Sequence, residues 1–253
     1  MLGCAREGNI MKKVATIEAR MTSTRLPGKV LMEACGKPML ELMIERVRRS
    51  KLLDDVVVAT TTNREDDKVV AMCDRIGCTY YRGSEDDVLL RVLEAAQSVS
   101  ADVIVELTGD CPCIDWRHID YLLKYYLEHD YDFVANNTEQ TFPDGFDIRI
   151  FSTKELARVN AATKDLKDHE HVSIYFPNNQ DRFKCYNWCA DKEERRPEYE
   201  VTLDEQGDYE LIKRIFEGLY PNNPDFKCSE VIKFLDGHQN LLQYVTDIKR
   251  TQL

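Results

Sequence analysis

The chain has 253 residues, a formal net charge of −11 and 31% charged residues. An acidic surface repels nucleic-acid phosphates and anionic lipid headgroups, so this charge argues against non-specific binding to either. The hydrophobic content of 43% argues against a disordered chain, and no apolar run approaches the ~18 residues that a membrane-spanning helix needs. The length suits one large α/β domain with a modest extra lobe.

Residues 1–10 contain one Arg and one Glu and no apolar stretch, so we expect an N-terminal extension and not a secretory signal. The nine cysteines are odd in number and scattered, which predicts free thiols in a reducing cytoplasm. Cys111 and Cys113 form the only tight pair. A zinc site would need two further ligands at suitable spacing, and none follows nearby, so we do not expect metal binding by this pair.

Residues 11–220 are predicted to form the main domain, in which short apolar runs alternate with helical patterns. We expect strands at Val14–Ile17, Val56–Ala59, Cys78–Tyr81, Val103–Leu107 and Asp132–Ala135. We expect helices at Met39–Ser50, Glu65–Ile76, Asp86–Ser98 and Trp116–Glu128. Alternation of this kind, with nearly continuous apolar strands, predicts a parallel sheet covered by helices on both faces.

The pattern changes after Asn136, and residues 137–190 are predicted to form a small lobe within this domain. The rest of the chain is expected to contain strands at Arg182–Ala190 and Tyr199–Leu203 and helices at Thr153–Ala162 and Asp208–Leu219. Residues 221–253 are predicted to form a C-terminal helix and tail.

The stretch "EARMTSTRLPGK" directly follows the first predicted strand and carries the cations Arg20, Arg25 and Lys29. These cations, with the hydroxyl groups of residues 22–24 and free backbone N–H groups, could bind a polyphosphate. The stretch is not a Walker loop, because Val30 follows Lys29, and the chain contains no GxGxxG motif. From charge alone, a solvated basic turn is an equally good interpretation.

Two carboxylates also follow apolar strands. Asp110 comes after Gly109 and the strand at 103–107, and Asp204 comes after the predicted strand at 199–203. In open parallel sheets ligands bind beyond the carboxyl ends of the strands, where such carboxylates could hold Mg²⁺ bridging phosphate oxygens. Each Asp could instead be a helix N-cap. Together with the cationic stretch, however, they suggest nucleotidyl or phosphoryl transfer.

The segments "TFPDGFDIRIF" and "DLKDHEHVSIYF" hold a further group of polar residues outside the parallel half. As a second lobe, they could recognise the acceptor of the transferred group. A single His-x-His is weak evidence for a metal, since a histidine at such a position is more often a surface or capping residue. The candidate acceptor residues are Asp144, Asp147, His169, Glu170 and His171.

Several motifs in order resemble those of one enzyme family: "ARMTSTRLPGKVL", "YRGSEDDVLLRVLEAA", "LTGDCPCID", "FPDGFDIRIF" and "HEHVSIYF". They are similar to motifs of the 3-deoxy-manno-octulosonate and acylneuraminate cytidylyltransferases, and most closely of the SpsF-like branch named for spore-coat polysaccharide biosynthesis. The resemblance covers roughly residues 14–219. It implies a GT-A-like, Rossmann-related nucleotidyltransferase fold, a three-layer sandwich with a mostly parallel central sheet and a small acceptor and dimerisation lobe.

The activity implied by the resemblance is Mg²⁺-dependent transfer of CMP from CTP to a sugar acid, sugar phosphate or related acceptor. Pyrophosphate would be released. The enzyme would be a cytoplasmic homodimer, and its product would serve surface polysaccharide or glycoconjugate biosynthesis. The implied catalytic residues are Arg20, Arg25, Lys29 and Asp110, and the implied metal ligands are Asp110 and Asp204. The implied nucleotide-binding residues are Ala19, Arg20, Met21, Thr22, Ser23, Arg25, Lys29, Thr61, Asn63, Gly83, Ser84, Asp87, Val88, Thr108 and Gly109. Asp144, Asp147, His169, Glu170 and His171 would face the acceptor.

The sequence also departs from the family pattern. Glu200 stands where related proteins carry an Arg four residues before the second metal Asp, and "EQGD" replaces a "TPED"-like run after it. Three alternatives remain open from the sequence: a glycosyltransferase with "EDD" at residues 85–87 as its metal motif, a guanylyl or other nucleotidyltransferase, and a noncatalytic nucleotide-binding protein. A hydroxyl acceptor would need a proton acceptor such as His169, whereas a phosphate acceptor would need cations such as Arg149, Arg195 or Arg196.

Overall fold

The computed structural model describes residues 11–246. The predicted N-terminal extension at 1–10 and the end of the predicted tail at 247–253 lie outside the described residues. Within the described part, no helix combines the length and the apolar character that crossing a membrane requires.

A seven-stranded mixed sheet forms the centre of the fold, with strand order β5-β4-β1-β6-β8-β7-β9. Its strands are β1 (Lys13–Glu18), β4 (Asp55–Thr61), β5 (Thr79–Gly83), β6 (Val103–Thr108), β7 (Phe133–Ala135), β8 (Arg149–Ser152) and β9 (Cys185–Asn187). β5, β4, β1 and β6 run parallel, whereas β8 is antiparallel to both β6 and β7. A separate hairpin pairs β2 (Glu33–Ala34) with β3 (Lys37–Pro38). The predicted mostly parallel sheet is confirmed.

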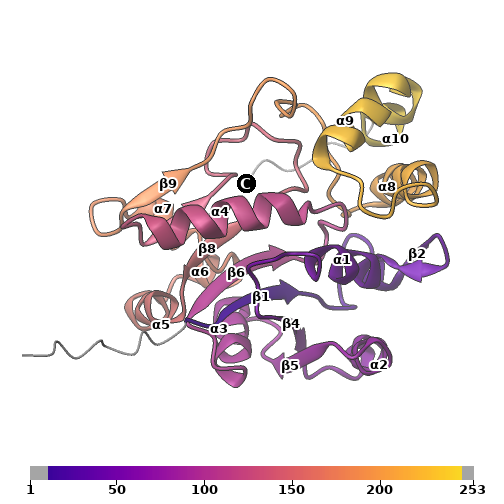
Figure 1. The fold of residues 1–253 in the computed structure, drawn as a ribbon. Helices are drawn as coiled ribbons and strands as arrows, with labels where there is room; N and C mark the ends of the chain where they lie inside the picture. The colour runs from indigo at the N-terminus through magenta and orange to yellow at the C-terminus, as the bar shows by residue number, and fades with distance from the viewer. Residues whose placement is uncertain (1–10, 247–253) are drawn as a thin grey trace, which may run out of the picture.

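Helices cover both faces of this sheet (Figure 1). They are α1 (Met39–Val47), α2 (Asp67–Ile76), α3 (Val88–Ser98), α4 (Trp116–Glu128), α5 (Thr153–Ala162), α6 (Leu166–Glu170), α7 (Tyr175–Asn178), α8 (Gln206–Leu219), α9 (Cys228–Gly237) and α10 (Gln243–Thr246). Short 3₁₀ helices lie at η1 (Lys29–Leu31), η2 (Arg64–Asp66) and η3 (Gln239–Leu242).

Alternate residues of β1 reach opposite layers, because side chains alternate across a strand. Ala15 and Ile17 pack with residues of α1, α2 and α4, whereas Val14 packs with residues of α3 and α5. A third apolar cluster joins α8 and α9 to the loops that follow β6 and precede β8. In Figure 1 helices α8 to α10 gather at the upper right, to one side of the central sheet.

The predicted strand at Tyr199–Leu203 is wrong. This segment is extended but makes only an isolated bridge between Glu200 and Asp144. Val201 and Leu203 are fully buried in the cluster beneath α8 and α9. Their apolar spacing therefore reflects packing under helices and not membership of a sheet. The other predicted elements are present. The helices predicted at 116–128 and 153–162 have the observed bounds, whereas other elements have shifted ends; β9, for example, fills only three residues of the strand predicted at 182–190.

The loops after β1 and β6 lie against each other, which fixes where the site forms. The N–H of Gly109 donates to the carbonyl oxygen of Glu18 at 2.8 Å. A Cβ atom at position 109 would lie 2.6 Å from that oxygen, so only glycine allows this approach. The cationic stretch after β1 and Asp110 after β6 are therefore held side by side.

Candidate active site

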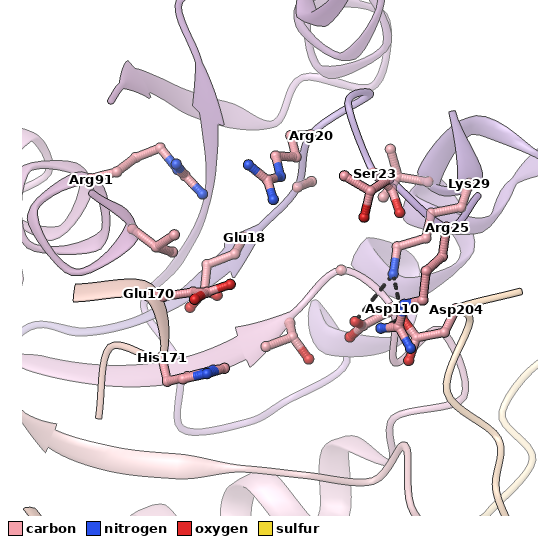
Figure 2. A pocket seen from close by; sticks show the side chains of 16 residues that line it. Glu18, Arg20, Ser23, Arg25, Lys29, Arg91, Asp110, Glu170, His171 and Asp204 are labelled. Carbon is pink, nitrogen blue, oxygen red and sulfur yellow. Dashed lines mark hydrogen bonds and ion pairs between the residues drawn. The ribbon is translucent and has the colours of Figure 1, made fainter. Parts of the chain in front are cut away.

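Four of the predicted residues form one charged cluster. The Lys29 Nζ lies 3.3 Å from Asp110 Oδ2 and 2.9 Å from Asp204 Oδ1. Arg25 Nη2 reaches the same Asp204 oxygen at 2.8 Å. Figure 2 shows these side chains converging from the loops after β1, after β6 and before α8. Residues far apart in sequence thus place two cations against two carboxylates.

Local structure explains how Lys29 reaches the carboxylates. Gly28 adopts φ 77°, and its N–H donates to the carbonyl oxygen of Met21 at 2.8 Å, so the cationic stretch closes into a loop before η1 begins at Lys29. The N–H of Leu203 donates to the carbonyl oxygen of Asp110 at 2.8 Å, which ties the segment before α8 to the loop after β6.

The interpretation of Asp110 and Asp204 as helix caps is wrong. Helix α4 is capped by Asp115, whose side chain accepts from the N–H of Arg117. Helix α8 is capped by Glu205, in a capping box with Asp208. Both predicted metal carboxylates are therefore left facing the cluster.

The cluster keeps Lys29 and Asp110 charged. Burial lowers the pKa of Lys29, but Asp110 and Asp204 outweigh burial and raise it above its ordinary value. Burial raises the pKa of Asp110, but Lys29 and hydrogen bonds from its neighbours outweigh burial and lower it. Two ionised carboxylates from separate segments are the oxygen donors that Mg²⁺ takes from proteins when substrate phosphates complete its coordination. The donor set thus fits the implied Mg²⁺.

The cluster lies at one end of a cavity of about 390 Å³. Its lining contains twelve of the predicted residues: Ala19, Arg20, Ser23, Arg25, Lys29, Val88, Thr108, Gly109, Asp110, Glu170, His171 and Asp204. The remaining predicted residues do not line it, and each has another place in the structure. These are Met21, Thr22, Thr61, Asn63, Gly83, Ser84, Asp87, Asp144, Asp147 and His169.

Glu85 connects three of the loops around the cavity. It accepts hydrogen bonds from Thr22 Oγ1 and from Asn63 Nδ2, the latter at 2.6 Å, and lies 3.4 Å from Arg20 Nη1. Hydrogen bonds from Thr22 and Asn63, more than the charge of Arg20, lower the pKa of Glu85. Thr22 and Asn63 therefore position loops, and Glu85 is a positioning residue that the sequence did not reveal.

Met21 and Thr61 are held by the buried Asp66 of η2. Asp66 Oδ1 accepts from the Met21 N–H at 2.6 Å, and its Oδ2 accepts from the Thr61 hydroxyl. These two predicted nucleotide-binding residues thus support the loops from behind.

Gly83, Ser84 and Asp87 form the turn into α3. A Cβ on Gly83 would lie 3.0 Å from Cγ of Arg91, and Ser84 Oγ accepts from the Asp87 N–H at 3.0 Å. Asp87 caps α3 and lies 2.8 Å from Nδ1 of His169. This contact, chiefly its hydrogen bond, raises the pKa of His169. His169 thus connects α6 to α3. The "EDD" stretch does not form a metal cluster, since Glu85 contacts Asn63 whereas Asp87 contacts His169.

A second cavity of about 600 Å³ adjoins the first. The two cavities share four lining residues: Glu18, Thr108, Glu170 and His171. The second cavity also reaches β8 and the segments around residues 137 and 173–178. Volumes of this size are typical of small-molecule sites.

Three charged residues along these cavities were missed by the sequence analysis: the buried Arg91 and Glu106, and the partly buried Glu18. Glu18 Oε1, Arg91 Nε and Glu106 Oε2 are buried without a hydrogen-bond partner among the described residues. Burial, and then the nearby Glu106, raise the pKa of Glu18 well above its ordinary value. Orphaned buried polar atoms that line a cavity indicate a ligand that satisfies them. The spacing of Val88 and Arg91, three residues apart on one face of α3, was the available signal for Arg91.

Arg149 is the one predicted acceptor cation that lines the second cavity. It lies 3.5 Å from Glu106 Oε1 and 3.4 Å from Asp147 Oδ2. Asp147 also accepts from Asn137 Nδ2 at 2.7 Å, so it orients Arg149 from outside the cavity lining. Asp144 lies farther off, where its backbone N–H donates to the carbonyl oxygen of Tyr199 at 2.9 Å. Arg195 and Arg196 do not line either cavity.

A mostly parallel sheet with cations and carboxylates at its carboxyl edge is the arrangement of a nucleotidyltransferase. A family model described as cytidylyltransferase matches residues 14–238, and the chain belongs to this cytidylyltransferase family. The sequence is 32% identical over 229 residues to the spore coat polysaccharide biosynthesis protein SpsF of Bacillus subtilis, covering 87% of this chain and 92% of that protein.

Two further comparisons also find cytidylyltransferases similar to this chain. The chain is 33% identical over 193 residues to the 3-deoxy-manno-octulosonate cytidylyltransferase of Geobacter metallireducens, covering 65% of this chain and 74% of that protein. A solved cytidylyltransferase structure from Leptospira borgpetersenii superposes with a TM-score of 0.87 at 31% identity, covering 96% of this chain and 99% of that one. The resemblance inferred from the motifs and the expected α/β fold with a mostly parallel central sheet are confirmed.

Proposed function

We propose that this chain is an Mg²⁺-dependent enzyme that transfers CMP from CTP to a sugar acid and releases pyrophosphate. The observation that carries the proposal is the cluster of Lys29, Asp110 and Asp204 in a cavity that adjoins a second cavity. The names of the related proteins support CTP as the donor and a sugar acid as the acceptor class.

In this proposal the first cavity takes the nucleotide. Arg20, Arg25 and Lys29 neutralise the triphosphate, and Ser23 donates a hydrogen bond to it. Asp110 and Asp204 hold Mg²⁺, which supplies charge neutralisation at the phosphate oxygens when bound. Most of the acceleration comes from positioning and from charge neutralisation, as is general for transfer to phosphorus.

The second cavity takes the acceptor. Arg149 is placed to bind its carboxylate, and Asn137 to bind a hydroxyl or amide. An acceptor oxygen attacks the α-phosphorus in line; the new P–O bond forms as the bond to pyrophosphate breaks. His171 borders both cavities, so we propose it, in place of His169, to accept the proton of an acceptor hydroxyl.

The glycosyltransferase alternative loses its sequence support, because the side chains of Glu85 and Asp87 are held apart by different partners. A different nucleotide remains the second candidate, since the described cavity contacts specify phosphate more clearly than base. We also propose a cytoplasmic homodimer. The eight cysteines that the structure describes are all free thiols, which supports a reducing compartment.

The test is a pyrophosphate-release screen of the four nucleoside triphosphates, each with pooled sugar acids, sugar phosphates and phosphonates, with and without MgCl₂. We expect release with CTP and sugar acids only when Mg²⁺ is present. Release that needs GTP, or none with any pair while a nucleotide-sugar donor is consumed, would overturn the proposal. Light scattering after size-exclusion chromatography tests the dimer.

A further inference from the structure

A second group of metal-ligating side chains lies outside the active site. The His118 Nε2 is 2.9 Å from Glu194 Oε2. An imidazole nitrogen of His118, a carboxylate oxygen of Glu194 and the Cys228 sulfur all lie within 4.8 Å of one another. His118 is in the first turn of α4, Glu194 is in the segment after β9, and Cys228 begins α9.

Two members of this cluster are buried in the apolar core beneath α8 and α9, and Glu194 is partly exposed. His118 is 5% exposed and Cys228 is fully buried. The His118 ring centre lies 5.0 Å from that of Phe142 and 5.1 Å from that of Trp188. Its Nδ1 is buried without a hydrogen-bond partner among the described residues. Buried polar atoms are normally satisfied, so Nδ1 lacks a partner; the ring nitrogen that faces Glu194, however, is Nε2.

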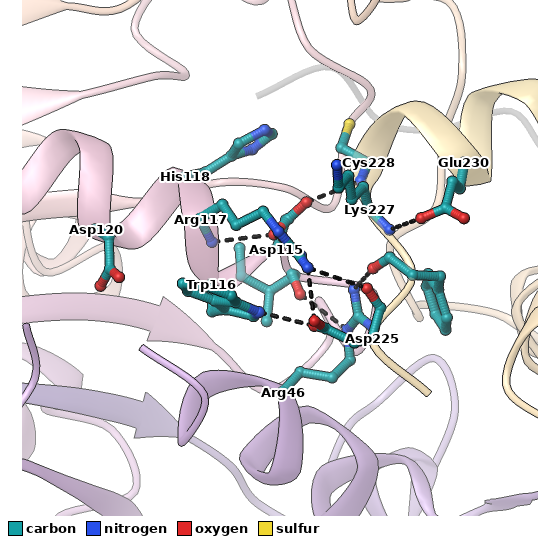
Figure 3. A network of polar contacts seen from close by, with 12 residues as sticks. Arg46, Asp115, Trp116, Arg117, His118, Asp120, Asp225, Lys227, Cys228 and Glu230 are labelled. Atoms are coloured by element: carbon teal, nitrogen blue, oxygen red, sulfur yellow. Dashed lines mark hydrogen bonds and ion pairs between the residues drawn. The ribbon is translucent and has the colours of Figure 1, made fainter. Parts of the chain in front are cut away.

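The surroundings hold Cys228 in place and are already balanced in charge. Asp115 Oδ2 accepts from the Cys228 N–H at 3.0 Å. Arg117 lies 3.0 Å from Asp115 Oδ1 and 2.6 Å from Asp225 Oδ2. The guanidinium of Arg46 donates to three carbonyl oxygens of this region. Figure 3 shows this network, with the His118 ring and the Cys228 sulfur together at one edge of it.

Two arginines therefore compensate the two aspartates, and the cluster of His118, Glu194 and Cys228 must be balanced by itself. Once a bound metal has displaced the thiol proton, a thiolate, a carboxylate and a neutral imidazole carry two negative charges together. A divalent cation would neutralise them, which matters most in a core where an unpaired charge is costly.

We propose that His118, Glu194 and Cys228 bind a zinc ion at a site separate from the proposed catalytic Mg²⁺ site. Zinc accepts mixed sulfur, nitrogen and oxygen ligands, whereas Mg²⁺ prefers oxygen alone. Ligand atoms around a tetrahedral zinc ion lie about 3.3 to 3.6 Å apart, which falls between the 2.9 Å contact and the 4.8 Å limit observed here. Three ligands leave a fourth position for water.

Zinc coordination replaces the thiol proton, which is released to solvent. Burial, and then the charges of Glu194 and Asp115, raise the pKa of the Cys228 thiol, so without metal the thiol stays protonated. The bound ion would join α4, α9 and the segment after β9. It would thus connect the segment that follows Asp110 with the one that precedes Asp204.

The test measures zinc directly and does not depend on turnover. The full chain, stripped with chelator and kept reduced in metal-free buffer, is titrated with ZnCl₂ and, separately, with CoCl₂. The variants are Cys228→Ser, His118→Gln and Glu194→Gln, all close in size to the native residues. Cys73→Ser is the matched control, since Cys73 is a buried thiol in the core between the sheet and α2. Asp110→Asn controls for binding at the active site.

We expect the wild type to bind one zinc ion per chain and to give a thiolate-to-cobalt charge-transfer band. Cys228→Ser should abolish the band, and each ligand variant should weaken zinc binding by more than the about 10- to 100-fold typical for loss of an outer partner of a ligand. Cys73→Ser and Asp110→Asn should retain both the charge-transfer band and the zinc affinity of the wild type. Circular dichroism establishes which variants are folded. Glu194→Gln changes a partly exposed residue, so it still tests the site if a variant at a buried position unfolds.

The proposal is overturned if the folded wild type binds no zinc, or if zinc binding persists unchanged in Cys228→Ser or in Glu194→Gln. Loss of zinc binding in Asp110→Asn would also overturn it, because the ion would then occupy the active site. None of these outcomes depends on the acceptor or on the nucleotide, so they are independent of the proposed function.

Discussion

Lys29→Met separates the structural role of Lys29 from its role toward phosphate. Methionine keeps most of the side-chain length but removes the ammonium that lies between Asp110 and Asp204. Removing one partner of a fully buried ion pair costs about 3–5 kcal/mol. The two Asp side chains are 27% and 16% exposed, and Arg25 remains beside Asp204, so we expect a loss of about 2 kcal/mol. For a chain of this length that is a fall in Tm of about 4–8 °C.

The same substitution should weaken CTP binding about 10- to 150-fold, because a charged hydrogen bond contributes about 1.5–3 kcal/mol. Excess MgCl₂ should restore part of the Tm of Lys29→Met, since the carboxylates then regain a cation. Scanning calorimetry with and without MgCl₂ measures stability, and titration calorimetry measures CTP affinity. Lys37→Met is the matched control: Lys37 also pairs with a carboxylate, that of Glu45 at 2.6 Å, but lines neither described cavity. Equal effects of the two substitutions on Tm and on CTP affinity would refute the reasoning.

Three further predictions concern the surroundings of the cluster. Gly109→Ala places a methyl group 2.6 Å from the carbonyl oxygen of Glu18, so the free energy of unfolding should fall by about 1–3 kcal/mol; an unchanged urea midpoint would contradict this close approach. Glu85→Gln removes the charge 3.4 Å from Arg20, and CTP affinity should fall about two- to fivefold by calorimetry; wild-type affinity would show that Glu85 does not position the loop. The pKa of Asp110 is lower in the folded protein than in the unfolded chain, so its ionised carboxylate stabilises the fold above the unfolded pKa of about 3.9. This contribution is lost as the pH falls through the lower pKa of the folded protein. Asp110→Asn should flatten this part of a Tm-against-pH curve, and an identical slope would exclude the assignment.

The sheet and its covering helices could be predicted because their periodicity is strong. The run at 103–107 is apolar apart from Glu106, since β6 is buried on both faces, and the α4 pattern at 116–128 matches the observed helix. At Tyr199–Leu203 the apolar pattern led to a wrong strand prediction. There, buried residues alternate with less buried ones because an extended segment lies under helices, and single-sequence patterns do not distinguish that packing from a β-ladder.

The candidate site was predictable where polar residues follow strands, and unpredictable where charges are buried inside elements. Asp110 and Lys29 stand in loops with unusual chemistry, so their convergence could be expected from sheet topology. Glu18 and Glu106 lie within β1 and β6, where a single charge in an apolar run gives no indication of the cavity it lines. The choice between His169 and His171 depended on which direction each faces around α6, which the sequence does not specify.

One cation in each cavity lies between two carboxylates. Lys29 lies between Asp110 and Asp204, and Arg149 lies between Glu106 and Asp147. A free anion that binds either cation must break an ion pair and leave a carboxylate without its partner, which costs more in a buried site than at the surface. A ligand that brings a divalent cation together with its phosphates compensates the carboxylates as it engages the ammonium. The charge pairing thus favours a metal-bound triphosphate over inorganic phosphate, and in the ligand-free protein Lys29 and Arg25 balance the charges of Asp110 and Asp204.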